Sequence, residues 1–320
     1  MMNKSFKIEE LSNESYFIAG QFIGNANSSI SDVVGIKESQ GKACSHHLSW
    51  INDKNVSLIN KPLELGLLIL NQSSFDSLKH HKCNFLIVEN PRSVFQKILK
   101  QYFSRKKSAG IEPSAFIHPT VKIPGGSYIG HNVVIEEGCT IGNDCEILHN
   151  SVIMQNTKIG DRVRIGSNCT IGNFGFGYEK NEHNDYDLIE HLGNVVIQND
   201  VHIHNNTCID RGVLGETYIG ENVKVDNLVH IAHGVRIERN SLIIANAMVA
   251  GSVLIGENSW IAPSTSIKNQ LTISSGTLTG IGAVVLKSSE KNDVLIGAPA
   301  TTMEEYKKWS VIRKSLLDQK

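Results

Sequence analysis

The sequence predicts an all-β-dominated fold, a parallel β-helix of six-residue repeats flanked by a small α/β N-terminal domain and a C-terminal helix. Isoleucine stands at every sixth position from Ile111 to Ile171, and the series resumes at Ile197 and, after a four-residue slip, at Ile219. Glycine often follows it, and a small or β-branched residue stands four positions later. A period of six fits neither a helix nor a simple strand, but it fits one short strand and one turn per repeat, with three repeats in each coil.

The N-terminal segment 1–108 lacks this period and is predicted to be a separate small domain. The stretch FLIVENP at 85–91 is typical of a buried strand that runs into a turn. The stretch RSVFQKILKQYF at 92–103 places its apolar residues at helical spacing. The polar and basic run SRKKSAG at 104–110 predicts a solvated linker.

The repeats predict a β-helix domain over 109–300, with the aliphatic and the small residue of each repeat pointing inward. The small inward position holds the cysteines Cys139, Cys145 and Cys169. We expect them to be space-filling thiols. A loop at 174–196 interrupts the repeats, and a second break at 210–217 is predicted to press against it. A loop of this length in a tight solenoid is typical of a functional element, with a cover over a neighbouring subunit as the alternative.

The last segment, 301–320, predicts an amphipathic helix. Thr302 and Glu305 have the spacing of a capping box, and acidic residues precede the lysines, which suits the helix dipole. Its apolar residues are expected to pack against the coils or against a neighbour: Met303, Tyr306, Trp309 and Leu316. A membrane role is disfavoured because this apolar face is short.

Composition excludes several classes of protein. The formal net charge of −1 argues against a nucleic-acid partner, which usually meets a basic face. The N-terminus lacks an apolar run of signal-peptide length, and no stretch is long enough for a transmembrane segment, so a cytoplasmic location is expected. The six cysteines include no C-x-x-C pair, which disfavours zinc clusters and redox chemistry.

The stretch VHIAHGV at 229–235 carries the strongest candidate for chemistry. His233 lies between the inward Ile231 and Val235, so its imidazole is predicted to point outward. One coil further on, Gly251 is predicted to bring an unobstructed backbone N–H beside the ring. An outward base next to such a donor suits acyl transfer, because the N–H can hold an oxyanion. Asp226, on the preceding face, is a candidate to orient the ring, and a histidine without a role is the alternative.

The second histidine of that stretch, His230, has Met248 one coil on and Cys208 one coil back. Because Cys208 adds at most one ligand, a zinc site within one subunit is not expected. A metal shared between subunits, as in hexapeptide-repeat carbonic anhydrases, stays open as an alternative. The chain contains no G-x-x-x-x-G-K-[ST], H-E-x-x-H or G-x-S-x-G motif.

Five segments resemble, in order, the UDP-3-O-acylglucosamine N-acyltransferases of lipid A synthesis: IVENPRSVFQKIL, GNFGFGYE, GNVVIQNDVHIHNNTCIDRG, VDNLVHIAHGV and GAPA before the final helix. The resemblance covers nearly the whole chain. It implies a left-handed parallel β-helix, a homotrimer with active sites between subunits, and an N-terminal domain that binds the nucleotide. It also implies that His233 is the general base, Asp226 its carboxylate neighbour, and the Gly251 backbone N–H the oxyanion donor.

The sequence departs from the family pattern in the coils. The pattern S-D-G-F-G-F appears as NFGFGY at 173–178, which removes an aspartate and keeps Phe174 and Phe176 as candidate substrate contacts. Gln270 stands where the family has a second active-site histidine, and His230 stands where it has glutamine. Both are therefore candidates for contacts in an altered substrate pocket.

The uracil-binding segment of the family appears as LSWINDKNV at 48–56. Trp50 keeps a stacking platform, whereas Asp53 replaces an asparagine and Val56 a tyrosine. A carboxylate in place of an amide removes a donor and penalises the same base partner.

These departures favour a paralogue that N-acylates another nucleotide-linked amino sugar for surface glycan synthesis, with acyl-CoA as donor. One alternative is lipid A synthesis itself, with UDP-3-O-acylglucosamine and acyl carrier protein. Another is a trimeric scaffold that binds sugar nucleotides without catalysis. No tightly bound cofactor and no metal are expected, since a thioester cosubstrate supplies the acyl group.

Overall fold

The structure, a computed structural model, describes residues 5–104 and 108–317. The chain divides into two compact units, Met1–Lys106 and Lys107–Lys320. The predicted linker at 104–110 spans this boundary, and its residues 105–107 lie outside the described part of the chain.

The N-terminal unit is an α/β fold on a five-stranded sheet in the order β2-β7-β6-β5-β4. The sheet strands are β2 (Gln21–Ile23), β4 (Asp32–Val33), β5 (Ala43–Trp50), β6 (Glu64–Leu70) and β7 (Lys82–Ile87), and a separate pair is β1 (Phe6–Lys7) with β3 (Ser29–Ile30). The helices are η1 (Ile8–Leu11), α1 (Ser15–Ile18), α2 (Ile36–Ser39), α3 (Asp53–Val56), α4 (Gln72–Leu78), α5 (Pro91–Ile98) and the π-helical turn η2 (Leu99–Phe103). Strand β6 is buried over nearly its whole length, as is typical of a central parallel strand.

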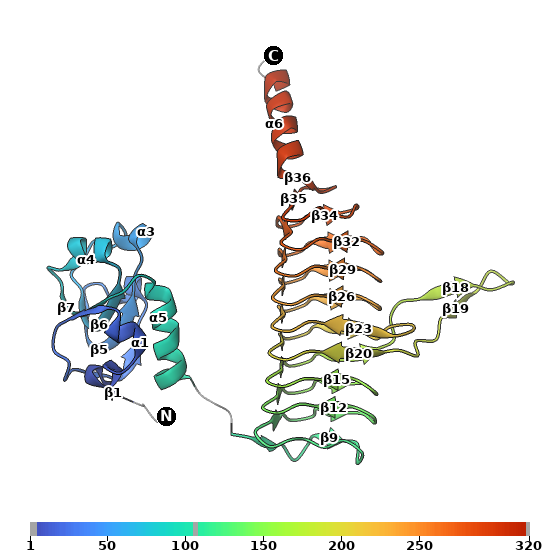
Figure 1. Cartoon of the computed structure of the whole chain (residues 1–320), viewed down its shortest axis with the longest axis horizontal. Helices are drawn as coiled ribbons and strands as arrows, with labels where there is room; N and C mark the ends of the chain where they lie inside the picture. Colours follow the sequence, from blue (N-terminus) through green and yellow to red (C-terminus); the bar gives the residue numbers. More distant parts are fainter. Residues whose placement is uncertain (1–4, 105–107, 318–320) are drawn as a thin grey trace. The chain divides into compact units, whose positions relative to one another are not determined.

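The second unit is a left-handed parallel β-helix with three sheets as its faces (Figure 1), and the predicted fold class is confirmed. The first face contains β8 (Gly110–Ile111), β10 (Tyr128–Ile129), β13 (Glu146–Ile147), β16 (Arg164–Ile165), β21 (His202–Ile203), β24 (Lys224–Val225), β27 (Leu242–Ile243), β30 (Trp260–Ile261), β33 (Leu278–Thr279), β35 (Val294–Ile296) and β36 (Thr301–Thr302). The second face contains β9 (Phe116–Ile117), β11 (Val134–Ile135), β14 (Val152–Ile153), β17 (Thr170–Asn173), β22 (Cys208–Asp210), β25 (His230–Ile231), β28 (Met248–Val249), β31 (Ser266–Ile267) and β34 (Val284–Val285). The third face contains β12 (Thr140–Ile141), β15 (Lys158–Ile159), β20 (Asn194–Ile197), β23 (Glu216–Ile219), β26 (Arg236–Ile237), β29 (Leu254–Ile255) and β32 (Thr272–Ile273).

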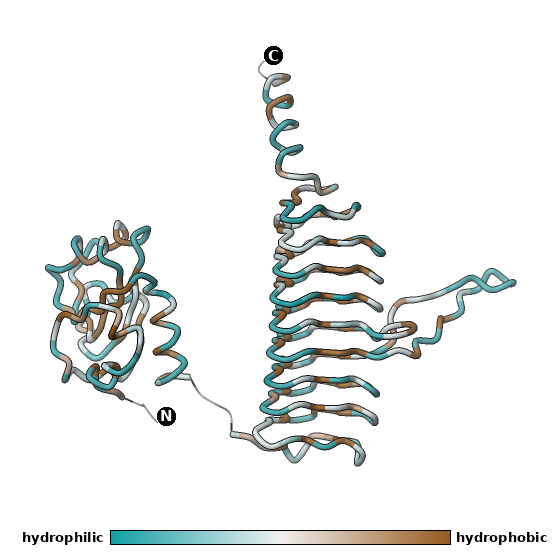
Figure 2. Tube along the Cα trace, viewed as in Figure 1, coloured by the Kyte–Doolittle hydropathy of each residue, from teal (hydrophilic) through white to brown (hydrophobic). Residues whose placement is uncertain are grey.

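The aliphatic residue of each repeat stacks on its equivalent in the next coil. Ile147 pairs with Ile129 below it and with Ile165 above it, and all three are fully buried. The predicted inward cysteines are buried as well, at 5%, 1% and 1% exposure for Cys139, Cys145 and Cys169. The hydrophobic colour therefore recurs at the same place in successive coils (Figure 2).

The turns between strands need a left-handed backbone, which explains the Asn and Asp residues at these positions. Asn150 and Asn240, for example, both have φ of 60°. Asparagine tolerates this conformation better than most residues with a side chain. Every coil can then turn at its corner without strain in the strands.

The two interruptions of the repeat lie against each other, as predicted. The first carries the hairpin of β18 (Tyr178–Lys180) and β19 (Tyr186–Leu188), which stands away from the coils (Figure 1). The Leu192 N–H donates to the Val213 carbonyl at 2.9 Å, and the Arg211 N–H donates to the Asn173 carbonyl at 2.9 Å. These bonds join both ends of the long loop to the second interruption.

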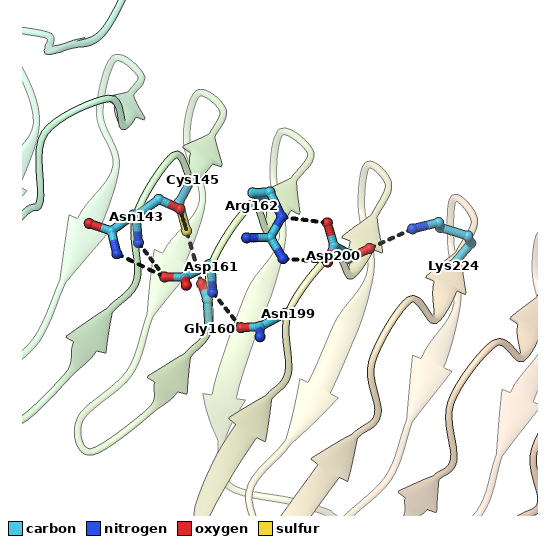
Figure 3. Close-up of polar contacts among 8 residues, drawn as sticks. All are labelled: Asn143, Cys145, Gly160, Asp161, Arg162, Asn199, Asp200 and Lys224. Atoms are coloured by element: carbon cyan, nitrogen blue, oxygen red, sulfur yellow. Dashed lines mark hydrogen bonds and ion pairs between the residues drawn. The ribbon is translucent and has the colours of Figure 1, made fainter.

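A polar ladder follows the turns that lead into the strands of the first face (Figure 3). Arg162 forms a two-pronged ion pair with Asp200, with nitrogen–oxygen distances of 2.8 and 2.6 Å. Lys224 donates to the Asp200 carbonyl from the next coil. Such contacts link successive coils where the side chains point to solvent.

The chain ends in α6 (Met303–Leu317), which starts with the predicted capping box. The Glu305 N–H donates to the Thr302 hydroxyl at 3.1 Å, and the Thr302 N–H donates to the Glu305 carboxylate at 3.1 Å. Tyr306, Trp309 and Leu316 are 49%, 66% and 62% exposed in the single chain, so of the two predicted options they do not take packing against the coils, and packing against a neighbour stays a prediction. Among the described residues, no helix has the length and apolar character to span a membrane.

Candidate active site

His233 occupies the turn after β25, and its ring lies against Gly251 in the next coil. A Cβ atom added to Gly251 would come within 2.7 Å of the His233 Cε1 and 2.8 Å of its Nε2. Only a glycine therefore leaves room for the imidazole there. The predicted stacking of these two residues is confirmed.

The backbone of Gly251 also has a donor to spare. Its carbonyl accepts from the Gln270 N–H at 2.9 Å. Its own N–H takes part in none of the hydrogen bonds found among residues 5–104 and 108–317. His233 thus packs against a glycine whose backbone donor is unused, an arrangement that acyl transfer can use.

A third histidine, His191, packs edge-on to the proposed base and was missed by the sequence analysis. The rings of His191 and His233 are 5.5 Å apart at an angle of 82°. His191 comes from the end of the 174–196 loop and is only 1% exposed. The sequence feature that could have identified His191 was its position just before β20, in the loop already expected to be functional.

The hydrogen bonds of His191 identify its tautomer. Its Nδ1 lies 2.6 Å from the Ile189 carbonyl, which can only accept, so Nδ1 carries the proton. In the neutral ring, Nε2 is then an acceptor. This buried Nε2 has no hydrogen-bond partner among the described residues.

The surroundings of His233 favour its neutral form. Burial lowers the pKa of His233, and the proximity of His191 lowers it further. A general base must be unprotonated to act, so both effects keep His233 available at neutral pH.

An acid–histidine pair lies on the same face. The Asp210 carboxylate at the end of β22 is 3.6 Å from the His230 Nε2. Burial raises the pKa of Asp210 to about 6, although His230 and His191 act in the opposite direction. The predicted neighbours of His230 are confirmed, since β25 pairs it with Cys208 on one side and Met248 on the other.

Arg211 and Phe174 close the base of the long loop. The buried Arg211 donates from Nε to the Gly172 carbonyl at 2.5 Å, and its guanidinium lies 5.4 Å from the centre of the Phe174 ring. Phe174 also contacts His191 edge-on at 5.9 Å. Phe176, in contrast, is 88% exposed.

Asp226 and Gln270, which the sequence placed in the site, make other contacts in the structure. One oxygen of Asp226 accepts from Asn227, and the other accepts from the Ala245 N–H at 3.2 Å. No hydrogen bond or ion pair joins Asp226 to His233 within the described chain, so the expected orienting contact is not made there. Gln270 is exposed in the turn one coil beyond Gly251.

The N-terminal unit has a pocket of about 290 Å³ beside Trp50. Phe95 and Asn55 also line it, and the Trp50 and Phe95 rings are 6.2 Å apart. An aromatic platform and a side-chain amide thus meet in one cavity. Asn55 was not singled out from the sequence because the family pattern directed attention to Asp53.

Asp53, the predicted contact for a bound base, has other hydrogen-bond partners in the structure. Its carboxylate accepts from the Ser73 hydroxyl, from the Ser74 hydroxyl at 2.8 Å and from the Asn71 amide at 2.7 Å. These hydrogen bonds lower the pKa of Asp53, and the one from Ser73 has the largest effect. The side chain therefore joins α3 to the start of α4 and does not line the cavity.

No metal centre is evident in the described residues, where no group of three or more His, Cys, Asp or Glu side chains is arranged to hold an ion. In the described part of the chain, the ion-pair partner found for His230 is the Asp210 carboxylate.

A β-helix of six-residue repeats with a half-buried histidine packed against a glycine is typical of a hexapeptide-repeat acyltransferase. Residues 216–251 match the family model for the bacterial transferase hexapeptide (six repeats). Residues 111–176 match the model of the GMPPB C-terminal domain.

The chain belongs to the UDP-3-O-acylglucosamine N-acyltransferase family. A member from Coxiella burnetii (strain Dugway 5J108-111) is 32% identical, over 92% of this chain and 90% of the relative. One from Campylobacter lari is 36% identical, over 75% of this chain and 79% of the relative. A third, from Caulobacter sp. (strain K31), is 39% identical, and the match spans 43% of this chain and 40% of that protein.

Solved structures confirm the fold. The UDP-N-acetylglucosamine acyltransferase from Campylobacter jejuni aligns with a TM-score of 0.56 and 23% identity, over 60% of this chain and 73% of that one. The corresponding enzyme from Francisella novicida gives 0.55 and 22%, over 60% and 68%.

Proposed function

We propose that this protein transfers an acyl group from a thioester to the amino group of a UDP-linked, 3-O-acylated glucosamine. The packing of the desolvated His233 on Gly251 is the observation that carries this proposal. The names of the family members supply the acceptor.

The site supports a direct transfer without a covalent enzyme intermediate. The substrate amine attacks the thioester carbonyl, and His233 takes a proton from the nitrogen as the new C–N bond forms. The Gly251 N–H stabilises the negative charge on the carbonyl oxygen. When the C–S bond breaks, the protonated His233 returns that proton to the leaving thiolate.

The pocket beside Trp50 is our candidate for the nucleobase. An indole offers a stacking face to any base, and the Asn55 amide has both a donor and an acceptor, as an amide partner for uracil requires. The Asp53 replacement had favoured a different nucleotide. Because the Asp53 carboxylate already accepts hydrogen bonds from Ser73, Ser74 and Asn71, it no longer favours a different nucleotide.

A second candidate acceptor keeps some support from the coils. His191 packs against the proposed base, His230 pairs with Asp210 on the same face, and Gln270 stands one coil beyond Gly251. This set favours the paralogue that acylates a different nucleotide-linked amino sugar. The two candidates share the chemistry of His233 and differ in the sugar and the acyl donor.

We also propose a homotrimer that works in the cytoplasm, where acyl-CoA and acyl carrier protein thioesters are made. The outer side of the second face is unusually apolar for a solvated surface. Its outward residues include Phe116, Val134, Val152, Met248 and Val284. A closed cyclic assembly would bury such a face.

A panel of purified substrates tests these proposals. The acceptors are UDP-3-O-acylglucosamine and a set of UDP- or dTDP-linked amino sugars. Each acceptor is combined with an acyl carrier protein thioester and, separately, with a CoA thioester. We expect the highest kcat/KM with UDP-3-O-acylglucosamine. A preference of about tenfold or more for another amino sugar would instead establish the second candidate, and no transfer with any pair would leave a non-catalytic binding protein.

Replacement of Trp50 by alanine should raise KM for the nucleotide sugar about tenfold and leave kcat at saturation unchanged. The reason is that base stacking contributes roughly 1–3 kcal/mol. Steady-state kinetics measures both constants, and Trp50→Phe, which keeps an aromatic ring, should recover most of the affinity. An unchanged KM in a folded Trp50→Ala variant would place the base elsewhere.

A further inference from the structure

The carboxylate of Asp210 is nearly buried and poorly satisfied. The residue is 8% exposed, and no hydrogen bond to its side chain occurs among the described residues. The single charged partner found within ion-pair distance in that part of the chain is His230, at 3.6 Å. Neither carboxylate oxygen is among the buried unpartnered atoms of the described residues, so this carboxylate stays open to water or to a ligand.

The charged groups around Asp210 come from several elements. His230 faces it from β25, and His191 approaches it from the long loop closely enough to influence its charge. Cys208 shares its own strand, β22. The guanidinium of the adjacent Arg211 is directed to the Gly172 carbonyl and the Phe174 ring instead.

The register of the strands places Asp210 near the proposed base. Ile209 pairs with Ile231 on the next coil, and Asp210 follows Ile209 directly while His233 follows Ile231 by two residues. The two residues are therefore one coil and one position apart. His191 contacts the His233 ring and also influences Asp210, which ties the two groups to one site.

N-acyl transfer has a proton requirement that O-acyl transfer lacks. An amine next to electronegative carbons resembles an α-amino group, whose pKa of about 7.7–8.0 leaves it mostly protonated at pH 7. An ammonium cannot attack a carbonyl. It must first lose one proton, and the nitrogen loses a second proton during attack, whereas only one proton leaves with the thiol.

We propose that Asp210, paired with His230, binds the substrate's ammonium and accepts its first proton, so that His233 is left free for the second. The inference rests on the proposed function. The ammonium donates to the Asp210 carboxylate directly or through one water, the N–H bond breaks, and the proton bonds to a carboxylate oxygen. The side chain of His230 is 44% exposed, and it passes that proton to solvent.

The raised pKa of Asp210, about 6, supports this role. An ordinary carboxylate is too weak a base to take a proton from an ammonium at a useful rate. Burial makes this one a stronger base, while it stays largely ionised at pH 7. Neutralisation of Asp210 by the incoming proton also relieves the cost of a buried charge.

The test compares two acceptors in the wild-type enzyme and in Asp210→Asn. One acceptor is the natural amino sugar nucleotide, and the other carries an aminooxy group at the same carbon, which is already neutral at pH 7. We expect the substitution to lower kcat/KM about tenfold or more for the amine and by less than twofold for the aminooxy compound. The defect with the amine should shrink as the pH rises and bulk solvent deprotonates it.

Matched variants separate this role from a structural one. Asp144→Asn, an exposed turn position with φ of 54°, makes the same chemical change and should leave both rates unchanged. Equal losses with both acceptors in Asp210→Asn, or no loss with either, would overturn the proposal. Failure of the wild-type enzyme to acylate any amine would instead refute the proposed function.

Discussion

Replacement of His233 by alanine is expected to lower kcat by about 10²- to 10⁴-fold, the range typical for loss of a general base. The ring lies on Gly251, and burial and then His191 lower its pKa, which favours the neutral form that can accept a proton. KM for the nucleotide sugar should change little, since the pocket beside Trp50 belongs to the N-terminal unit.

The pH dependence gives a second measure of the same role. The base must be unprotonated, and its pKa lies below the usual range of histidine, so activity should persist to a lower pH than an ordinary imidazole allows. The aminooxy acceptor isolates this ionisation, because it has no ammonium to deprotonate. In the wild-type enzyme, the midpoint of the acid limb of the kcat/KM profile should therefore lie below pH 6.5.

The matched control is His204→Ala, which removes an exposed histidine from another turn of the β-helix. It should leave kcat unchanged. If His233→Ala were folded, of unchanged oligomeric state and fully active, His233 would not be the base.

Replacement of Gly251 by alanine should lower kcat about 10²-fold with little loss of thermal stability. The added Cβ would lie 2.7 Å from the His233 Cε1, well inside van der Waals contact, so the imidazole must move. A displacement of about 1 Å can cost two orders of magnitude in rate. The fold should tolerate the change because the obstructing atoms belong to a half-buried side chain and not to the backbone.

Gly125→Ala is the appropriate control, since a Cβ there meets nothing within 4 Å. Its kinetics and melting temperature should match those of wild type. Wild-type kcat in Gly251→Ala would show that the close packing of the ring does not matter for catalysis. A large fall in melting temperature would show instead that the added methyl group destabilises the β-helix coil.

The repeat made most of the fold predictable. A period of six specifies one strand and one turn, and the register of 18 residues between Ile129 and Ile147 follows from three repeats per coil. The same register placed His233 beside Gly251 and His230 beside Cys208 and Met248. Neighbouring coils are hydrogen bonded, so the register turns sequence separation directly into spatial contact.

Contacts made by irregular segments were not predictable in this way. His191 reaches the site at the end of a loop that lacks the repeat, so no spacing rule connects it to His233. Asp53 looked like a base-binding residue, but the start of α4 comes within hydrogen-bonding distance of its carboxylate. Asp226 likewise bonds to its own turn and to Ala245.

The sequence by itself determined the β-helix, its coil register and the pair of His233 and Gly251, because each depends on a strict period and on local turn chemistry. Only the tertiary structure decided the electrostatics of the site. Burial lowers the pKa of His233, raises that of Asp210 and leaves one nitrogen of His191 without a partner among the described residues. Burial depends on how distant segments pack together, which no local pattern records.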